Sequence, residues 1–108
     1  MFAGMNREDQ IFRALGDPTR RAVFERLCRG EAAVGELTSG FDVSQPAISQ
    51  HLRVLRGAGL VSERRAGRNV YYRVEPRGLR PLVDWLGHYQ AFWTERLEHL
   101  KTLLEELR

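Results

Sequence analysis

Apolar residues recur with helical spacing along most of the chain, and this spacing gives way to strict alternation only between about residues 60 and 75. Ahead of this segment, short periodic runs separated by glycines predict four helices, over residues 6–15, from Pro18 to just before Gly30, over residues 34–40 and over residues 44–56. Behind it, large apolar residues every three or four positions predict one long helix over residues 79–107.

Two of the helix starts carry specific capping residues. Asp17 precedes Pro18, and Ser44 stands two positions before Pro46, so that each side chain can accept from a free amide of the first turn. In the helix that Ser44 begins, Ile48 and Leu52 lie four residues apart on the side that should face the core.

The alternating segment predicts a β-hairpin. Its two runs flank residues 66–69, a turn sequence that contains Gly67, and Val70, Tyr72 and Val74 share one face of the second run. The expected order is α-α-α-α-β-β-α, a mainly α fold with a β-hairpin. At 108 residues, the chain should form a single domain over residues 1–108.

Composition limits the class of protein. No run reaches the roughly 18 apolar residues that a membrane span needs, and the N-terminal ten residues lack the apolar stretch of a secretion signal. A single cysteine, Cys28, suits a reducing cytoplasm. Cys28 lies one turn after Phe24 on an apolar stripe, which favours a buried structural thiol over a redox sensor.

Charge is unevenly distributed. Residues 44–80 hold eight arginines and two glutamates, a local charge of +6, whereas residues 84–108 have a local charge of −2. A basic segment beside an acidic one indicates a polyanion-binding part and a second part with another task.

The residues from 34 to 56 have the layout of a helix-turn-helix, in which the second helix enters the major groove of DNA. Its outward side is polar, and glutamine and arginine side chains pair with adenine and guanine edges. Arginines at the tip of the following hairpin suit a minor groove or phosphates. The predicted DNA-binding residues are Ser44, Gln45, Ser49, Gln50, His51, Arg53, Arg56, Arg64, Arg65 and Arg68.

Taken together, "ALGDPTRRAVFERL", "VGEL", "SQPAISQHLRVLRGAGLV" and "RRAGRNVYYRV" resemble the ArsR-type family of bacterial winged-helix repressors over residues 8–75. This resemblance implies a cytoplasmic homodimer that regulates transcription, with the recognition helix over residues 44–56, the wing over residues 60–75 and dimerisation through residues 6–15 and 79–107. The interface residues expected from it and from the apolar spacing are Ile11, Leu82, Leu86, Tyr89, Trp93, Leu97, Leu100 and Leu104.

Many members of that family sense metals, and here the sequence departs from their pattern. The positions of the paired cysteines of the arsenic and cadmium sensors match Ala33 and Gly35, which cannot ligate a soft metal. His88 and His99 have the histidine spacing of the zinc and cobalt sensors, but Leu86 and Thr102 replace the carboxylates. Neither a metal nor another cofactor is expected.

The expected function is repression at an inverted-repeat operator, with an unidentified small molecule as a partner that releases the DNA. Two alternatives stay open: a regulator or activator without a ligand, and a winged helix that binds proteins instead of DNA. Trp85, Phe92 and Trp93 are expected in the dimer core, with a ligand pocket at the subunit interface as the alternative. Nothing in the sequence supports catalysis, so an enzyme is not expected.

Overall fold

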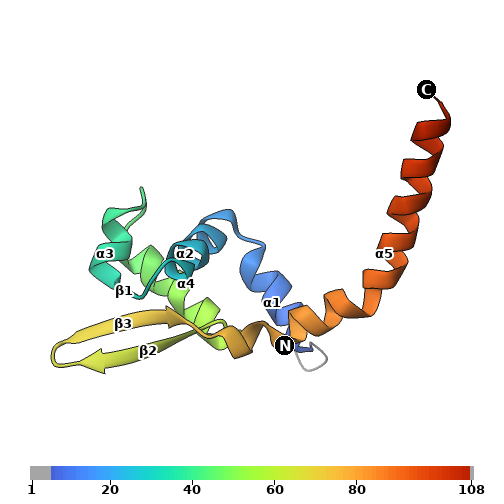
Figure 1. Ribbon diagram of the computed structural model, residues 1–108. Coiled ribbons are helices and arrows are strands. Elements are labelled where there is room, and N and C mark those ends of the chain that lie inside the picture. The colour runs from blue at the N-terminus through green and yellow to red at the C-terminus, as the bar shows by residue number, and fades with distance from the viewer. Residues whose placement is uncertain (1–5, 108) are drawn as a thin grey trace.

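The computed structural model describes residues 6–107. The prediction that the N-terminal ten residues hold no secretion signal therefore falls partly, for residues 1–5, outside the described residues. The fold is mainly helical, with a small antiparallel sheet and a long C-terminal helix (Figure 1). Its elements are α1 (Arg7–Leu15), α2 (Pro18–Cys28), β1 (Ala32–Ala33), α3 (Val34–Ser39), α4 (Gln45–Gly57), β2 (Val61–Ala66), β3 (Asn69–Val74), the 3-10 helix η1 (Pro76–Leu79) and α5 (Arg80–Glu106).

The predicted caps are confirmed. Asp17 accepts a hydrogen bond from the amide of Arg20 at 2.9 Å, and this bond lowers the pKa of the Asp17 carboxyl because it favours the charged form. Ser44 accepts from the amide of Ala47 at 3.3 Å. These bonds satisfy amides that have no partner inside the helix, and they fix where α2 and α4 begin.

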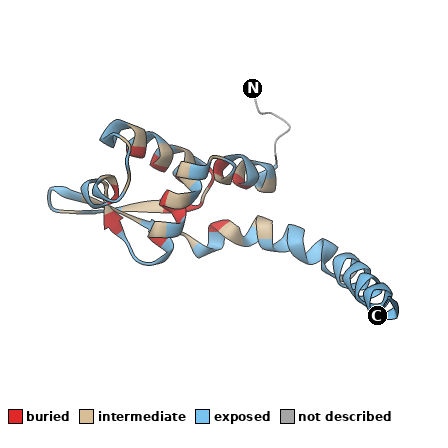
Figure 2. Cartoon of the chain, turned by 90° about the horizontal axis from the view of Figure 1, so that it is seen from above, coloured by how far each residue is buried: buried red, intermediate tan, exposed pale blue. Residues whose placement is uncertain are grey.

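The core lies between α1, α2, α3, α4 and the start of β2, as the buried positions in Figure 2 show. Its largest fully buried side chains are Ile11, Val23, Leu37, Ile48, Leu52, Leu55 and Leu60. The prediction that Ile11 lies in a dimer interface is wrong, because Ile11 has no exposed surface and packs inside its own chain. Phe12, which is 42% exposed, is the large apolar side chain that α1 presents to the outside.

The sheet contains one strand more than the sequence predicted. Its order is β1-β3-β2, all antiparallel, and β1 pairs Ala32 with Tyr72 and Ala33 with Tyr71. The β2–β3 hairpin is confirmed, with Gly67 at φ 64° in its two-residue turn. A positive φ at the first central position fits a type II′ turn and explains the glycine. The hairpin extends from the body on the side opposite to α5 (Figure 1).

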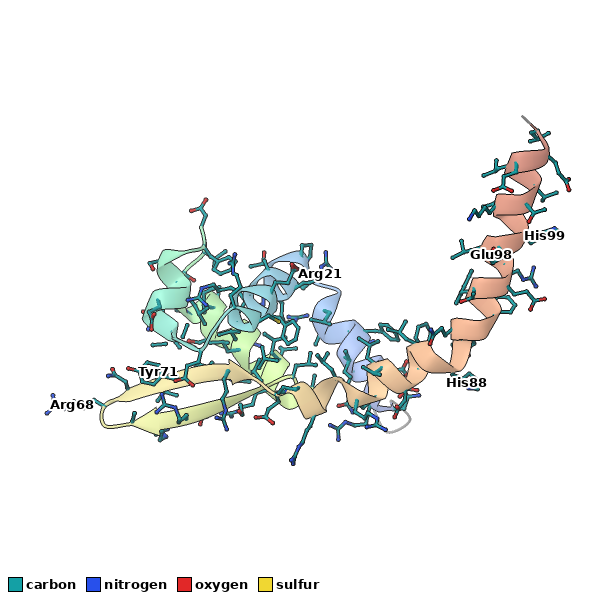
Figure 3. All side chains as sticks on the ribbon, in the orientation of Figure 1. Arg21, Arg68, Tyr71, His88, Glu98 and His99 are labelled. Atoms are coloured by element: carbon teal, nitrogen blue, oxygen red, sulfur yellow. The ribbon has the colours of Figure 1, made fainter. Side chains whose placement is uncertain are left out.

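The long helix α5 runs away from the body and changes direction near His88 (Figures 1 and 3). The chain therefore measures 63 × 36 × 24 Å and has a radius of gyration of 18.3 Å. A compact domain of this length would have a radius of gyration of about 13 Å. No helix within residues 6–107 is both long and apolar enough to cross a membrane.

The root of α5 is fixed by contact between two glycines. A Cβ on Gly78 would lie 1.7 Å from the carbonyl oxygen of Gly59, far inside any allowed contact. Gly59 itself has φ 78° and follows the end of α4. This close backbone approach positions η1, and with it the start of α5, against the end of α4.

Cys28 is exposed, so the prediction of a buried structural thiol is wrong. Val23, Phe24 and Leu27 make up the buried residues of α2, and Cys28 is the last residue of that helix, next to the exposed C-cap Arg29. The apolar stripe therefore ends one residue before the cysteine.

Candidate nucleic-acid interface

Helix α4 separates its apolar and polar residues onto opposite sides, as the sequence predicts. Ile48, Leu52 and Leu55 are buried, and they hold the helix against the body of the chain. The polar side chains on the other side are exposed: Ser44, Gln45, Ser49, Gln50, Arg53 and Arg56. An anchored helix with an exposed row of hydrogen-bonding side chains has the shape that major-groove reading requires.

Two of these side chains lie close to each other. Arg53 Nη1 donates to Gln50 Oε1 at 3.4 Å across one turn of the helix. The pair presents a guanidinium and an amide side by side, which are the groups that recognise guanine and adenine edges.

Arg56 links α4 to the hairpin. Its Nη1 lies 2.8 Å from Glu63 Oε2 on β2, and the arginine side chain stays half exposed. The guanidinium therefore has a carboxylate partner within the chain, and a phosphate would have to share or displace it.

Arg64 is held in the same way. Its guanidinium forms an ion pair with Glu31 and lies 4.9 Å from the ring centroid of Tyr71. The hydrogen bond from Arg64 lowers the pKa of the Glu31 carboxyl, because it favours the charged form. Arg64 thus points back along the sheet toward the residue before β1, away from the hairpin turn.

Arg65 and Arg68 are exposed, and neither has an ion-pair or hydrogen-bond partner in the part of the chain that the structure describes. Arg68 lies at the tip of the hairpin and points away from the body (Figure 3). These two arginines, rather than Arg64, are the cations that the hairpin offers to a polyanion.

Tyr72 on β3 faces α4. It lines a hollow of about 160 Å³ together with Ser49, Leu52, Arg53 and Arg56, between the helix and the hairpin. Burial raises the pKa of the Tyr72 phenol, and the carboxylate of Glu63 raises it further. The phenol therefore stays protonated and lies beside the two arginines of the helix.

His51 is less accessible than the other predicted residues. It is half-buried, and its Nδ1 lies 3.5 Å from Arg20 Nη1 on α2. His51 thus borders the polar face and also contacts the body of the chain.

The apolar side of α5 lies open. Along its length, every large apolar residue from Val83 to Leu107 is at least one-third exposed, and Trp93 and Leu97 reach 58% and 63%. Leu82 is half-buried against the core of its own chain. The interface residues expected on α5 that remain exposed are Leu86, Tyr89, Trp93, Leu97, Leu100 and Leu104.

No group of three or more His, Cys, Asp or Glu side chains that could hold a metal ion occurs within residues 6–107. His88 packs edge-on against Tyr89, with ring centroids 4.9 Å apart. Figure 3 shows His88 near the bend of α5 and His99 farther along the helix, beside Glu98.

Three residues beside the predicted arginines were not found from the sequence: Glu31, Glu63 and Tyr72. Glu31 and Arg64 are 33 positions apart, so that no local pattern relates them. Glu63 and Tyr72 are paired across the hairpin, and this register could be read from the turn once its type was fixed.

The chain matches the family model described as bacterial regulatory protein, arsR family, over residues 17–63. The HTH-type transcriptional regulator Rv2034 of Mycobacterium tuberculosis is 45% identical over 97 residues, which cover 90% of this chain and 88% of the relative. The transcriptional repressor SdpR of Bacillus subtilis is 33% identical over 75% of this chain and 90% of the relative.

Solved structures agree with these matches. A crystal structure of an ArsR family transcriptional regulator superposes with a TM-score of 0.74 and 36% identity, covering 82% of this chain and 98% of the other. The transcriptional repressor BigR from Xylella fastidiosa gives a TM-score of 0.60 and 34% identity over 82% and 97% of the two chains. The relatives and solved structures named here are regulators of transcription and not enzymes. The chain belongs to the ArsR family of bacterial regulatory proteins, and it has their winged-helix fold.

Proposed function

We propose that this protein is a homodimeric, sequence-specific DNA-binding repressor of transcription that recognises an inverted-repeat operator. The observation that carries the proposal is the exposed polar face of α4, the recognition helix, next to the β2–β3 hairpin, the wing. In this assignment Gln50 and Arg53 read base edges, and Arg65 and Arg68 contact the backbone or the minor groove.

The names of the relatives support the direction of regulation. SdpR and BigR are both called transcriptional repressors. A dimer seated on a promoter represses by occupying it, so that this fold needs no further domain for the proposed role.

The exposed apolar side of α5 supports the dimer. Nine large apolar side chains between Leu86 and Leu107 remain open in the single chain, and a partner helix would cover them. Their spacing of three and four residues suits helix-on-helix packing. In such a dimer the two recognition helices would lie about one DNA turn apart, roughly 34 Å, facing successive major grooves.

The proposed regulator works without the metal sites of its metal-sensing relatives. Ala33 and Gly35 stand where two cysteines would be needed, and His88 and His99 have no carboxylates at the matching positions. Release from DNA would then depend on a different ligand or on none.

The test is to select fragments of the source genome that the purified protein retains, to footprint the bound site and to titrate salt. We expect a twofold-symmetric footprint, and an affinity that falls steeply with salt because arginines displace counterions from phosphates. A flat salt response, or no retained fragment, would contradict the proposal and favour a protein partner for the winged helix.

A further inference from the structure

A groove lies where α1, η1 and α5 meet, and none of its lining residues belongs to the predicted DNA-binding set. Its volume is about 650 Å³, which is within the size range of small-molecule sites. Its walls come from residues 6–8 of the α1 start, from Arg77 of η1 and from the first turns of α5. Elements distant in sequence thus form one shallow groove that is mostly open to solvent.

The groove gathers positive charge. Arg7 and Arg77 line it, and within residues 6–107 neither guanidinium has an ion-pair or hydrogen-bond partner. Arg80 is already engaged, because its Nε lies 2.9 Å from Asp84 Oδ1. With Glu8 as the second acid, the lining carries a net charge of +1 when His88 is neutral. This balance suits one negative charge and disfavours polyphosphates.

One wall of the groove is apolar and aromatic. Trp85 lines it and is 37% exposed, and Pro81 lies beside it. The indole contacts two other rings: Phe12 packs edge-on at a centroid distance of 5.0 Å, and Tyr89 lies at 5.1 Å in a tilted arrangement. These contacts fix the indole, and its exposed part can pack against a flat apolar group.

We propose that this groove binds a small aromatic carboxylate. The carboxylate would accept from two N–H groups of Arg77 in a bidentate pair, Arg7 would add positive charge, and the ring of the ligand would lie against Trp85.

The position of the groove also gives the ligand a regulatory effect. The Phe12–Trp85 contact joins α1 to α5, so a ligand on Trp85 touches both helices at the root of α5. A ligand that binds one angle of α5 better than another shifts the population toward that angle. This regulatory part rests on the proposed function, because the angle of α5 would set the separation of the two recognition helices; the binding site itself does not.

The binding test uses the full chain, phenylacetate as the probe and phenethyl alcohol as its neutral counterpart, followed by NMR shifts of backbone amides. We expect phenylacetate to shift amides of residues 7–8 and 77–88 and to bind at least tenfold more tightly than the alcohol. Arg77→Gln should weaken phenylacetate at least tenfold. Arg29→Gln, which removes an exposed arginine elsewhere, should leave it unchanged.

A second variant acts in the opposite direction. Asp84→Asn releases Arg80 and removes a negative charge from the lining, so that phenylacetate should bind several-fold more tightly. Equal binding of the acid and the alcohol, an Arg77→Gln variant that binds as the parent does, or shifts spread outside the groove would overturn the proposal.

DNA binding is measured separately on the retained genomic fragment. We expect phenylacetate to change the affinity of the parent protein for this fragment and to leave the Arg77→Gln variant unaffected. Phenylacetate binding without any DNA binding would contradict the proposed function and support the binding site. DNA binding without any phenylacetate binding would contradict the binding site and support the proposed function.

Discussion

Arg56 at the end of the recognition helix and Glu63 on the first strand of the wing form an ion pair of 2.8 Å. This contact ties together the two elements that the proposed function places on DNA. It also neutralises a cation at the centre of that surface. Glu31 does the same for Arg64, so two of the predicted DNA-binding arginines already have carboxylate partners.

Replacing the wing carboxylate should strengthen binding to DNA of any sequence. In Glu63→Gln, Arg56 loses its charged partner and becomes available to a phosphate. We expect the affinity for a random duplex to rise several-fold and the slope of log K against log salt to steepen by about 0.9, the value for one added phosphate contact. Fluorescence anisotropy over a salt series measures both, with Glu25→Gln on α2 as the matched control. Weaker binding by Glu63→Gln would mean that the pair orients Arg56 for DNA.

Base reading should depend on the middle of the recognition helix. Gln50→Ala and Arg53→Ala should each cost about 1–3 kcal/mol at the operator and relax its sequence preference at one or two base pairs. Arg68→Ala at the wing tip should instead weaken all sequences similarly. Competition assays against operators with single base changes distinguish the two patterns. Normal operator binding by all three variants would show that the reading surface is assigned wrongly.

Dimerisation should depend on the exposed stripe of α5. Leu97 is 63% exposed in the single chain, so Leu97→Glu leaves the fold intact but would bury an unpaired carboxylate in the proposed seam. We expect the dimer dissociation constant to rise at least a hundredfold in sedimentation equilibrium. Thr102→Glu adds the same charge on the opposite side of α5 and should leave the dimer unchanged. Two variants that dissociate equally would contradict this seam.

The glycine contact at the root of α5 should be intolerant of a side chain. In Gly78→Ala the new Cβ meets the carbonyl oxygen of Gly59, and the backbone has to move. We expect a loss of about 1–3 kcal/mol in the free energy of unfolding, as for other overpacked sites. Gly87→Ala, where nothing lies within 4 Å, should gain up to about 1 kcal/mol from its helical position. Urea unfolding at one fixed protein concentration compares them.

Acid should weaken the cap of α2. The hydrogen bond from the Arg20 amide lowers the pKa of Asp17 below its ordinary 3.8, so the folded chain binds fewer protons than the unfolded one in that range. The stabilisation by the charged cap is therefore complete above that ordinary value and is lost as pH falls through the lowered pKa. Asp17→Asn keeps a capping side chain without this titration. Its urea midpoint should fall less between about pH 6 and pH 3 than that of the parent.

The sequence was sufficient where structure depends on local chemistry. Asp17 and Ser44 mark helix starts through bonds to residues three positions ahead, and Gly67 marks the turn of the wing through its positive φ. Such signals act within one turn, so that spacing alone predicts them.

The sequence was insufficient where structure depends on the assembled fold. Strand β1 has only two residues, and it exists because Ala32 and Ala33 lie along β3 in the folded chain. Ile11 is buried and Cys28 is exposed because of how the other elements of the core pack against α1 and α2. The spacing within one helix does not contain this information. The partners of Arg56 and Arg64 are fixed by the register and twist of the sheet, which bring carboxylates from distant positions.

The open stripe of α5 has a consequence for the life of the protein in the cell. In a newly made subunit that has not yet dimerised, this stripe is exposed to water. Chaperones and proteases recognise such exposed apolar surfaces. Association would hide it and prolong survival. At low concentration a larger fraction of the subunits would be unassembled and would be degraded. The steady-state concentration of the regulator would then fall more than in proportion when its synthesis slows.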